Sequence, residues 1–496
     1  MDSVAKSPTR STGRNSAGNI LSVRRRSTFI TYLAIGIGIF LVNGIAFSLI
    51  PEGEIRHYLA VGYLFQTGMF AFFSFARHDF LAIRLLQPSM ITLIYVGLSC
   101  TAGAWAFDSK NVSNILGRQY YFMWNNLGDA YILISLCFLA LYSLSLRNLG
   151  LPKDNLAFQN NIHDRRKSQI FLLLVLISCL ALTINLKIGI ISQIKTVIVA
   201  SIFYVLFKFD VKYKWVLALL VIGILSSTSF HSKREAIFAL PAMFLISLAY
   251  LPRTRISLFN LALGVVGFVF IVTLILAMSI LRGYGGFGAE NIFEAITFIP
   301  DYVELPNSLA FIFNNFEVTY IFLHFHQCVS SILDSPRMMA DGSTYARMLL
   351  IWPVGDLLGY KPPSIIEQYT GAFFPYFRDE GGSFGVTSIG EAVWNFGWLA
   401  PLALLAVYFG LDALFAKTVH LIRERKAWST IVALTICQFS LYFSRGSGLD
   451  IFVIYVLFSV VSAYAITLLI AIFQAGDESP PKLWKGAARP RPRHQW

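Results

Sequence analysis

Basic side chains gather where apolar segments of the chain begin and end, and there they could bind a phosphate group. A guanidinium group forms two parallel hydrogen bonds with a phosphate and keeps its charge at every working pH. Beside an aromatic-rich, acidic loop, several such groups suit a ligand with a phosphate head, a sugar portion and a lipid tail. The candidates for binding the phosphate head are Lys233, Arg234, Arg282, Arg347, Arg378 and Arg445.

A second set of residues could carry acid–base chemistry. The charged run Arg378-Asp379-Glu380 precedes a loop rich in Gly and Ser, and this loop leads into an apolar helix that carries Glu391. A carboxylate at the edge of hydrocarbon is costly unless it faces a polar cavity. His324 is a third candidate, because an imidazole titrates near neutral pH. The catalytic candidates are therefore Glu391, Glu380 and His324, and the sequence does not choose among them.

Local ion pairs are the alternative interpretation for three of the arginines, of which Arg234 could pair locally with Glu235 in an interfacial anchor. Arg445 could pair with Asp450 across a short loop, and Arg347 could pair with Asp341 or Asp356. In that case these side chains would fix loops in place and would not touch a ligand.

Neither a metal site nor a cofactor is expected. His324 and His326 lie two residues apart, which places them on different sides of a helix, and packing inside the protein is their alternative role. The five cysteines form no C-x-x-C pair, so we interpret them as small core residues. The sequence also contains no G-x-x-x-x-G-K-[ST], H-E-x-x-H or G-x-S-x-G motif.

The elements that must position these residues are membrane helices. Hydrophobic residues make up 56% of the 496-residue chain and charged residues only 14%, whereas soluble proteins carry about 25% charge. The apolar runs do not alternate with polar residues as barrel strands do, and the run at 268–280 is apolar on every face. The sequence therefore predicts an all-α, polytopic integral membrane protein.

We expect about twelve transmembrane helices and one long loop. The tail at 1–27 precedes nine spans within 28–281, the loop covers 282–389, three spans lie within 390–473, and a second tail covers 474–496. A span needs roughly 20 mainly apolar residues. The expected spans are 28–50, 58–76, 89–107, 129–146, 169–186, 190–207, 215–230, 235–250, 258–281, 390–414, 428–444 and 449–473.

The distribution of charge predicts which side of the membrane each segment faces. If both tails are cytoplasmic, 27 of the 40 Lys and Arg residues lie on the cytoplasmic side, as the positive-inside rule requires. Residues 282–386 hold 11 Asp and Glu against 5 Lys and Arg, so this stretch carries −6 and the rest of the +13 chain carries +19. The long loop is therefore expected outside, with 309–333 as an interfacial or re-entrant helix. The basic tails suit anionic membrane lipid, and no nucleic-acid partner is expected.

This arrangement resembles bacterial O-antigen and oligosaccharide repeat-unit polymerases, the Wzy-type family. The architecture of about a dozen spans with one dominant outer loop resembles theirs over most of the chain. Three short stretches resemble family segments: the basic turn Ser232-Lys233-Arg234, the loop-to-helix segment from Gly382 through Glu391 to Gly397, and the final outer Ser444-Arg445-Gly446.

The resemblance implies a glycosyltransferase C-like membrane fold and a metal-independent glycosyltransferase in the bacterial inner membrane, with its active site facing the periplasm. Such an enzyme transfers a growing glycan from undecaprenyl diphosphate to a second lipid-linked repeat unit. Its expected partners are the lipid-linked oligosaccharide, membrane lipid, a chain-length regulator and a flippase. Arg234, Arg282, Arg347 and Arg445 would then neutralise the leaving diphosphate, whose charge builds in the transition state.

Three other functions stay open at this point. A related O-antigen ligase would use the same chemistry with lipid A core as the acceptor. A lipid-linked oligosaccharide transporter would place charge near the middle of the membrane, in broken helices. A membrane acyltransferase acting on glycans would call for a histidine near a water-accessible pocket.

Overall fold

The computed structural model describes helices along most of the chain. The structure describes residues 13–50, 55–78, 82–108, 126–150, 166–184, 194–208, 211, 213–227, 233–250, 273, 276–277, 280, 289, 292–304, 317–350, 363–379, 382–423 and 427–475. Within these ranges the secondary structure is helical and no residue is in a strand. The longer helices are α1 (Gly13–Ser48), α2 (Ile55–Arg77), α3 (Pro88–Asp108), α4 (Leu127–Ser145), α5 (Arg166–Ile184), α6 (Ile194–Lys208), α7 (Lys214–Ser227), α8 (Lys233–Tyr250), α13 (Glu317–Asp334), α19 (Ala400–Arg423), α20 (Ala427–Arg445) and α21 (Leu449–Ala475).

Shorter helices lie mainly in the interval predicted as the long loop. They are η2 (Ala82–Leu86), α10 (Ile292–Thr297), α11 (Ile299–Glu304), η5 (Pro336–Met338), α14 (Ser343–Ala346), η6 (Arg347–Leu350), α16 (Ile365–Phe373), α17 (Pro375–Asp379), α18 (Thr387–Phe396) and η7 (Gly397–Leu399). The predicted interfacial helix corresponds in part to α13, which packs against α3 and α18.

Several helices are long and apolar enough to cross a membrane, and the protein is an all-α membrane protein. Among the described residues six stretches qualify by length and composition: Thr28–Ser48, Tyr58–Arg77, Leu127–Ser145, Thr387–Ile422, Ala427–Arg445 and Leu449–Ala471. Helices α3, α5, α6, α7 and α8 cover five further predicted spans, and most of the predicted span at 258–281 lies outside the described residues. The total of twelve spans, the outer position of the long loop and its boundaries stay predictions.

The predicted tenth span differs from the structure in one respect. Its apolar stretch is divided at Gly397, where α18 ends, and α19 begins after a single 3-10 turn. Gly397 has φ of +52°, which glycine adopts at little cost. Glu391 therefore lies on a short separate helix and not in the first turn of a continuous span.

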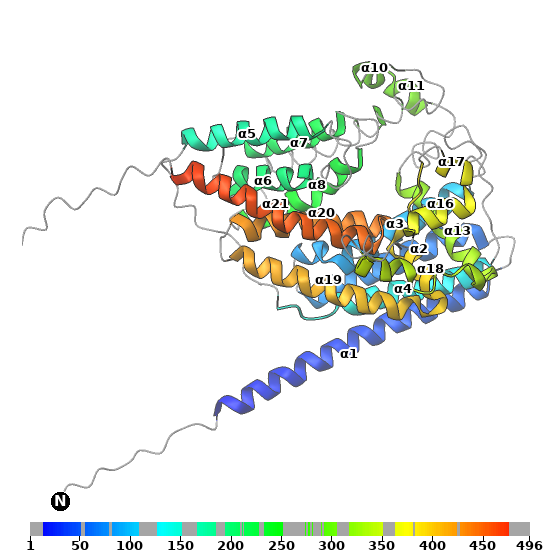
Figure 1. Cartoon of the computed structure of the whole chain (residues 1–496). Helices are drawn as coiled ribbons and strands as arrows, with labels where there is room; N and C mark the ends of the chain where they lie inside the picture. The colour runs from blue at the N-terminus through cyan, green and yellow to red at the C-terminus, as the bar shows by residue number, and fades with distance from the viewer. Residues whose placement is uncertain are drawn as a thin grey trace, which may run out of the picture.

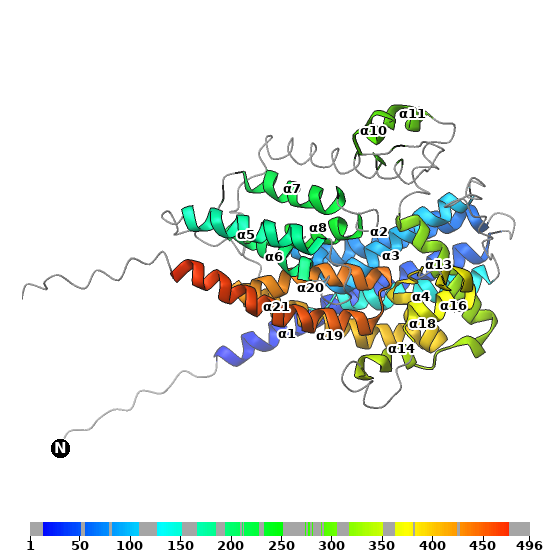
Figure 2. The ribbon, with the colours of Figure 1, turned by 45° about the horizontal axis from the view of Figure 1, so that its top comes forward.

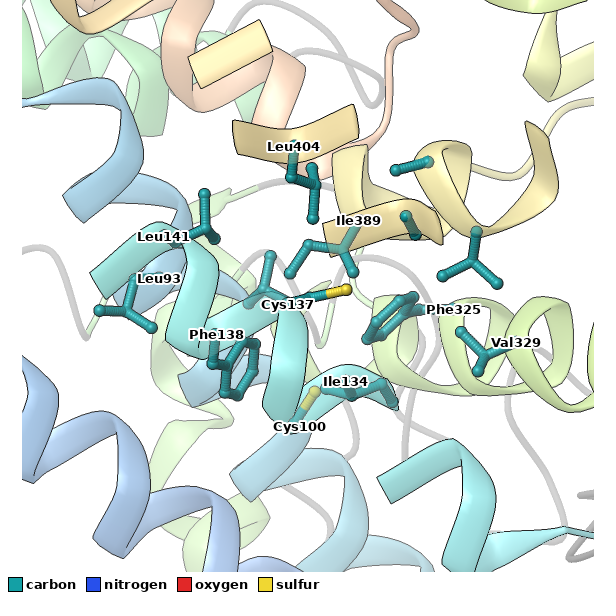
Figure 3. Close-up of a cluster of buried hydrophobic side chains, with 14 of the residues drawn as sticks. Leu93, Cys100, Ile134, Cys137, Phe138, Leu141, Phe325, Val329, Ile389 and Leu404 are labelled. Carbon is teal, nitrogen blue, oxygen red and sulfur yellow. The ribbon is translucent and has the colours of Figure 1, made fainter. Parts of the chain in front are cut away.

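One hydrophobic core joins α1–α4 to α13 and α18. Figure 3 shows its centre, where Cys137 of α4 points toward Phe325 of α13 and Ile389 of α18, and Phe138 lies on another side of α4. All four side chains are buried. Burial of large apolar side chains stabilises by about 1.5–3 kcal/mol each, so this core fixes α18 and the residues that it carries.

A second core lies among α5–α8 and the other ends of α19–α21. Figures 1 and 2 show α5–α8 grouped beside one end of these three long helices, and α2–α4, α13 and α18 beside the other. Tyr408 of α19 and Phe443 of α20 belong to the first core, whereas Phe415 and Ile436 of the same helices belong to the second. The long helices α19–α21 thus connect the two groups.

Candidate active site

Glu391 lies on the buried helix α18, close to the junction between α20 and α21. The side chain is 1% exposed. On one face of α18, a Cβ at Gly390 would lie 3.1 Å from the Phe325 ring of α13, and the Cys328 thiol of α13 donates to the Gly390 carbonyl (3.6 Å). Because α13 packs so closely, the orientation of α18 and of Glu391 is fixed by the core.

Both carboxylate oxygens of Glu391 accept a hydrogen bond. The Thr344 hydroxyl donates to Oε1 (3.0 Å), and the backbone N–H of Leu449 donates to Oε2 (3.0 Å). Asn395 donates to the Thr344 hydroxyl (2.7 Å) and to the Glu391 carbonyl (2.7 Å). A buried carboxylate needs such donors, and Leu449 is the first residue of α21, where a helix N-terminus favours negative charge.

Arg347 joins two further carboxylates to this region. Its Nε lies 2.6 Å from Asp450 Oδ2, and its Nη1 lies 3.0 Å from Glu367 Oε2. The side chains are 13% exposed for Arg347, 2% for Asp450 and 50% for Glu367. The chain of charges therefore leads from the surface at Glu367 to the interior at Asp450.

The two buried carboxylates also act on each other. Asp450 follows Leu449 at the start of α21 and exerts a Coulombic effect on Glu391. Two like charges in a weakly polar interior repel strongly, and a buried charge without a counterion is costly. Arg347 supplies positive charge on the Asp450 side, so we interpret Glu391, Asp450 and Arg347 as one electrostatic unit.

Two glycines allow the loop between α20 and α21 to approach this unit. Gly446 has φ of +112°, and a Cβ there would lie 2.4 Å from the Thr387 backbone nitrogen. Gly448 has φ of +94°, and a Cβ there would lie 2.8 Å from Asp450 Oδ1. Thr387, at the start of α18, itself has φ of +66°. The backbone is thus close-packed and conformationally costly next to Glu391.

Arg445 and Arg378 lie near this region on other elements. Arg445 is the last residue of α20 and is half-buried, and its carbonyl oxygen would lie 3.1 Å from a Cβ at Gly385. Arg378 is exposed on α17, and its Nη1 would lie 2.6 Å from a Cβ at Gly371. The end of α20 at Arg445 therefore contacts the loop before α18, whereas Arg378 folds over α16.

His324 lies within an aromatic cluster. Its ring stacks on Phe384 with centroids 4.1 Å apart, and it meets the rings of Phe374 and Tyr369 edge-on. Its Nδ1 lies 3.2 Å from the Tyr369 hydroxyl. Burial lowers the pKa of His324 from 6.5 to about 3, so the ring is neutral and a weak base at neutral pH. The structure therefore favours the packing interpretation for this residue.

The remaining predicted residues are not brought to the site by any described contact. Lys233 and Arg234 are the first two residues of α8, and their side chains lie outside the described part of the protein. Arg282 and Glu380 also lie outside the described residues. Their roles stay predictions.

The sequence does not predict the roles of four residues that shape the site. It suggests Asp450 only as a partner of Arg445 and gives no role to Thr344 or Glu367, and it places Asn395 in the candidate segment after Glu391 without a role of its own. Ser364-x-x-Glu367 does have the pattern of a capping box, and α16 begins with one, so this signal was present. Nothing in the local sequence predicts that Thr344 contacts Glu391 or that Arg347 contacts Asp450. These contacts depend on packing between segments that are distant in the chain.

Among the described residues no group of three or more His, Cys, Asp and Glu side chains is placed to hold a metal ion. The chain was also compared with known proteins. No protein-family model matches it, and neither a curated protein nor a solved structure with significant similarity was found.

Proposed function

We propose that this protein is a polysaccharide polymerase of the inner membrane. It would transfer a growing glycan from undecaprenyl diphosphate to a lipid-linked repeat unit on the outer side of the membrane. The observation that carries this proposal is the contact of Arg347 with Asp450 beside the buried Glu391, at the end of a helical bundle that suits a membrane. Such a site combines an arginine that can bind a phosphate group with a carboxylate that can accept a proton.

The proposed step needs both kinds of group. The acceptor hydroxyl attacks the anomeric carbon, a new glycosidic bond forms, and the bond from that carbon to the diphosphate oxygen breaks. The diphosphate leaves with the bonding electron pair, and Arg347 and Arg445 offset its charge. The hydroxyl proton passes to a carboxylate, for which we select Glu391, because His324 is a weak base in its aromatic cluster.

Surrounding residues cover the Glu391 side chain in this structure, so a substrate cannot reach it without a movement. At 1% exposure its carboxylate meets no solvent. A substrate hydroxyl reaches it only when covering residues move, and Arg347, at 13% exposure, lies between the surface and Asp450. We infer that substrate binding replaces the ion pair of Arg347 with Glu367 before transfer, while the ion pair with Asp450 stays in place.

The proposal is tested by deleting the gene and resolving the surface glycan on a gel. A polymerase predicts that the ladder of chain lengths collapses to a single repeat unit, which still reaches the surface. An intact ladder in the deletion strain would contradict the proposal.

The same strain separates the alternatives. Long polymer that stays on its lipid carrier would indicate a ligase, and precursor that accumulates on the cytoplasmic side would indicate a transporter. Loss of acyl groups with unchanged chain length would indicate an acyltransferase.

A further inference from the structure

We propose that Glu367 occupies the position on Arg347 that the substrate diphosphate takes, and that the two anions exchange there. This inference rests on the proposed function and names how the site receives its substrate. Arg347 contacts the carboxylates of Asp450 and Glu367. These two side chains differ in solvent exposure, so we assign different roles to them.

Asp450 is suited to hold Arg347 permanently. It contacts Nε at 2.6 Å, and its side chain is 2% exposed. Removing one partner of a buried ion pair leaves an uncompensated charge, which is strongly unfavourable. The position of Asp450 is also fixed by the start of α21 and by the close approach of Gly448. We therefore assign Asp450 as a positioning residue for Arg347.

Glu367 is suited to be displaced. It contacts Nη1 of Arg347 at 3.0 Å, and its side chain is 50% exposed. An ion pair with an exposed partner is screened by water and contributes little, about 0–1 kcal/mol. A diphosphate carries more charge than one carboxylate and can accept two hydrogen bonds from a guanidinium. Competition at Nη1 thus favours the diphosphate.

Glu367 also accepts hydrogen bonds from Ser364, and it keeps these donors when it leaves Arg347. Its Oε2 accepts from the backbone N–H of Ser364 (2.6 Å) and from the Ser364 hydroxyl (2.9 Å). The first of these bonds belongs to the capping box of α16, in which the Glu367 N–H donates in return to the Ser364 hydroxyl oxygen (3.3 Å). The carboxylate would keep these two bonds after an anion took its place on Arg347. The exchange therefore leaves α16 folded.

The surface beside Arg347 fits an anion with a lipid tail. Leu349, two residues further along η6, is 70% exposed. An apolar side chain next to an exposed ion pair matches a ligand whose diphosphate is joined to a polyprenyl chain. We commit to that ligand class, a lipid diphosphate.

The test is a binding experiment on the purified full-length protein in detergent. Calorimetry at low ionic strength would measure the affinity for farnesyl diphosphate and, separately, for inorganic pyrophosphate. The informative variant is Glu367→Gln, because glutamine also completes a capping box and so preserves α16 while removing the competing charge. Arg347→Gln removes the binding group, and Arg337→Gln changes an exposed arginine of η5 as the matched control.

We expect Glu367→Gln to tighten binding by about two- to fivefold, Arg347→Gln to weaken it at least as much, and Arg337→Gln to leave it unchanged. Tightening for both ligands would assign the site to the diphosphate group itself, and tightening for farnesyl diphosphate alone would assign it to the lipid carrier. Unchanged or weaker binding in Glu367→Gln, with an unchanged melting temperature, would overturn the exchange. That result would leave the polymerase proposal standing, since the glycan ladder tests it separately.

Discussion

At the scale of single residues, the site depends on charges that satisfy one another in the interior. Arg347 was selected from the sequence because of its type and position, and Glu391 because a carboxylate lies at the edge of an apolar helix. The partners were not predictable, since Asp450 and Thr344 lie far along the chain from the groups that they contact. Helical periodicity determines which face a residue is on but not which distant segment packs there.

Glu391 is predicted to stabilise the fold through its two hydrogen bonds. Replacing it with Ala leaves the Leu449 N–H and the Thr344 hydroxyl without their acceptor, at about 1–3 kcal/mol for each buried group. Glu391→Gln keeps an amide oxygen that can accept one of them. Thermal unfolding in detergent should therefore give a lower melting temperature for Glu391→Ala than for Glu391→Gln, and equal values would contradict these bonds.

The contact between Arg347 and Glu367 is predicted to weaken in acid. Burial alone raises the pKa of Glu367, but the Ser364 backbone, the Ser364 hydroxyl and Arg347 outweigh it, so the pKa lies below its usual value. A lowered pKa in the folded state means that the stabilisation is fully present above the unfolded-state pKa and is lost as pH falls through the folded-state pKa.

This pH dependence is measured as the stability difference between wild type and Glu367→Gln. The difference should be below about 1 kcal/mol near neutrality, because Glu367 is half-exposed, and it should disappear in acid. A difference that grows as the pH falls would have the wrong sign for this account.

At the scale of elements, α18 and the loop between α20 and α21 determine the site. The sequence indicated an apolar stretch near 390–414 but not its division at Gly397, because hydropathy does not register a change of backbone direction. The Gly- and Ser-rich segment before α18 did predict a loop at this position. The left-handed conformation of Thr387 had no sequence signal, since threonine seldom adopts it.

Gly446 is predicted to be intolerant of any side chain. Alanine there would combine an unfavourable positive φ with a Cβ 2.4 Å from the Thr387 nitrogen, and we expect a loss of more than about 1 kcal/mol. Gly410, on α19, has no atom within 4 Å of a Cβ, so Gly410→Ala serves as the control. Thermal unfolding of the two variants should show a lower melting temperature only for Gly446→Ala, and an unchanged value there would mean that the loops are not packed as described.

At the scale of the whole molecule, the all-α membrane class was predictable from composition alone, and the six apolar stretches found among the described residues are consistent with it. The division into two hydrophobic cores was not predictable, because each of α19, α20 and α21 contributes one end to each core. Uniformly apolar helices carry little information about which neighbour they face. The orientation in the membrane stays a prediction based on the distribution of Lys and Arg.

The orientation is tested by labelling single cysteines in intact cells. Tyr376→Cys lies on α17 and is 84% exposed, and His420→Cys lies exposed near the opposite end of α19. Four of the five native cysteines are buried, so background labelling of the native cysteines should be low. A membrane-impermeant maleimide should label Tyr376→Cys directly and His420→Cys only after permeabilisation, and the reverse pattern would place the site on the cytoplasmic side.

The most direct test of the whole account is the chain-length distribution of surface glycan in a deletion strain that expresses Arg347→Gln. The account predicts a single repeat unit and no ladder when Arg347→Gln is expressed to the same level in the membrane as the wild type, whereas Arg337→Gln at that level restores the full ladder. A normal ladder from Arg347→Gln would contradict the assignment of this arginine, and with it the proposed site of glycan transfer.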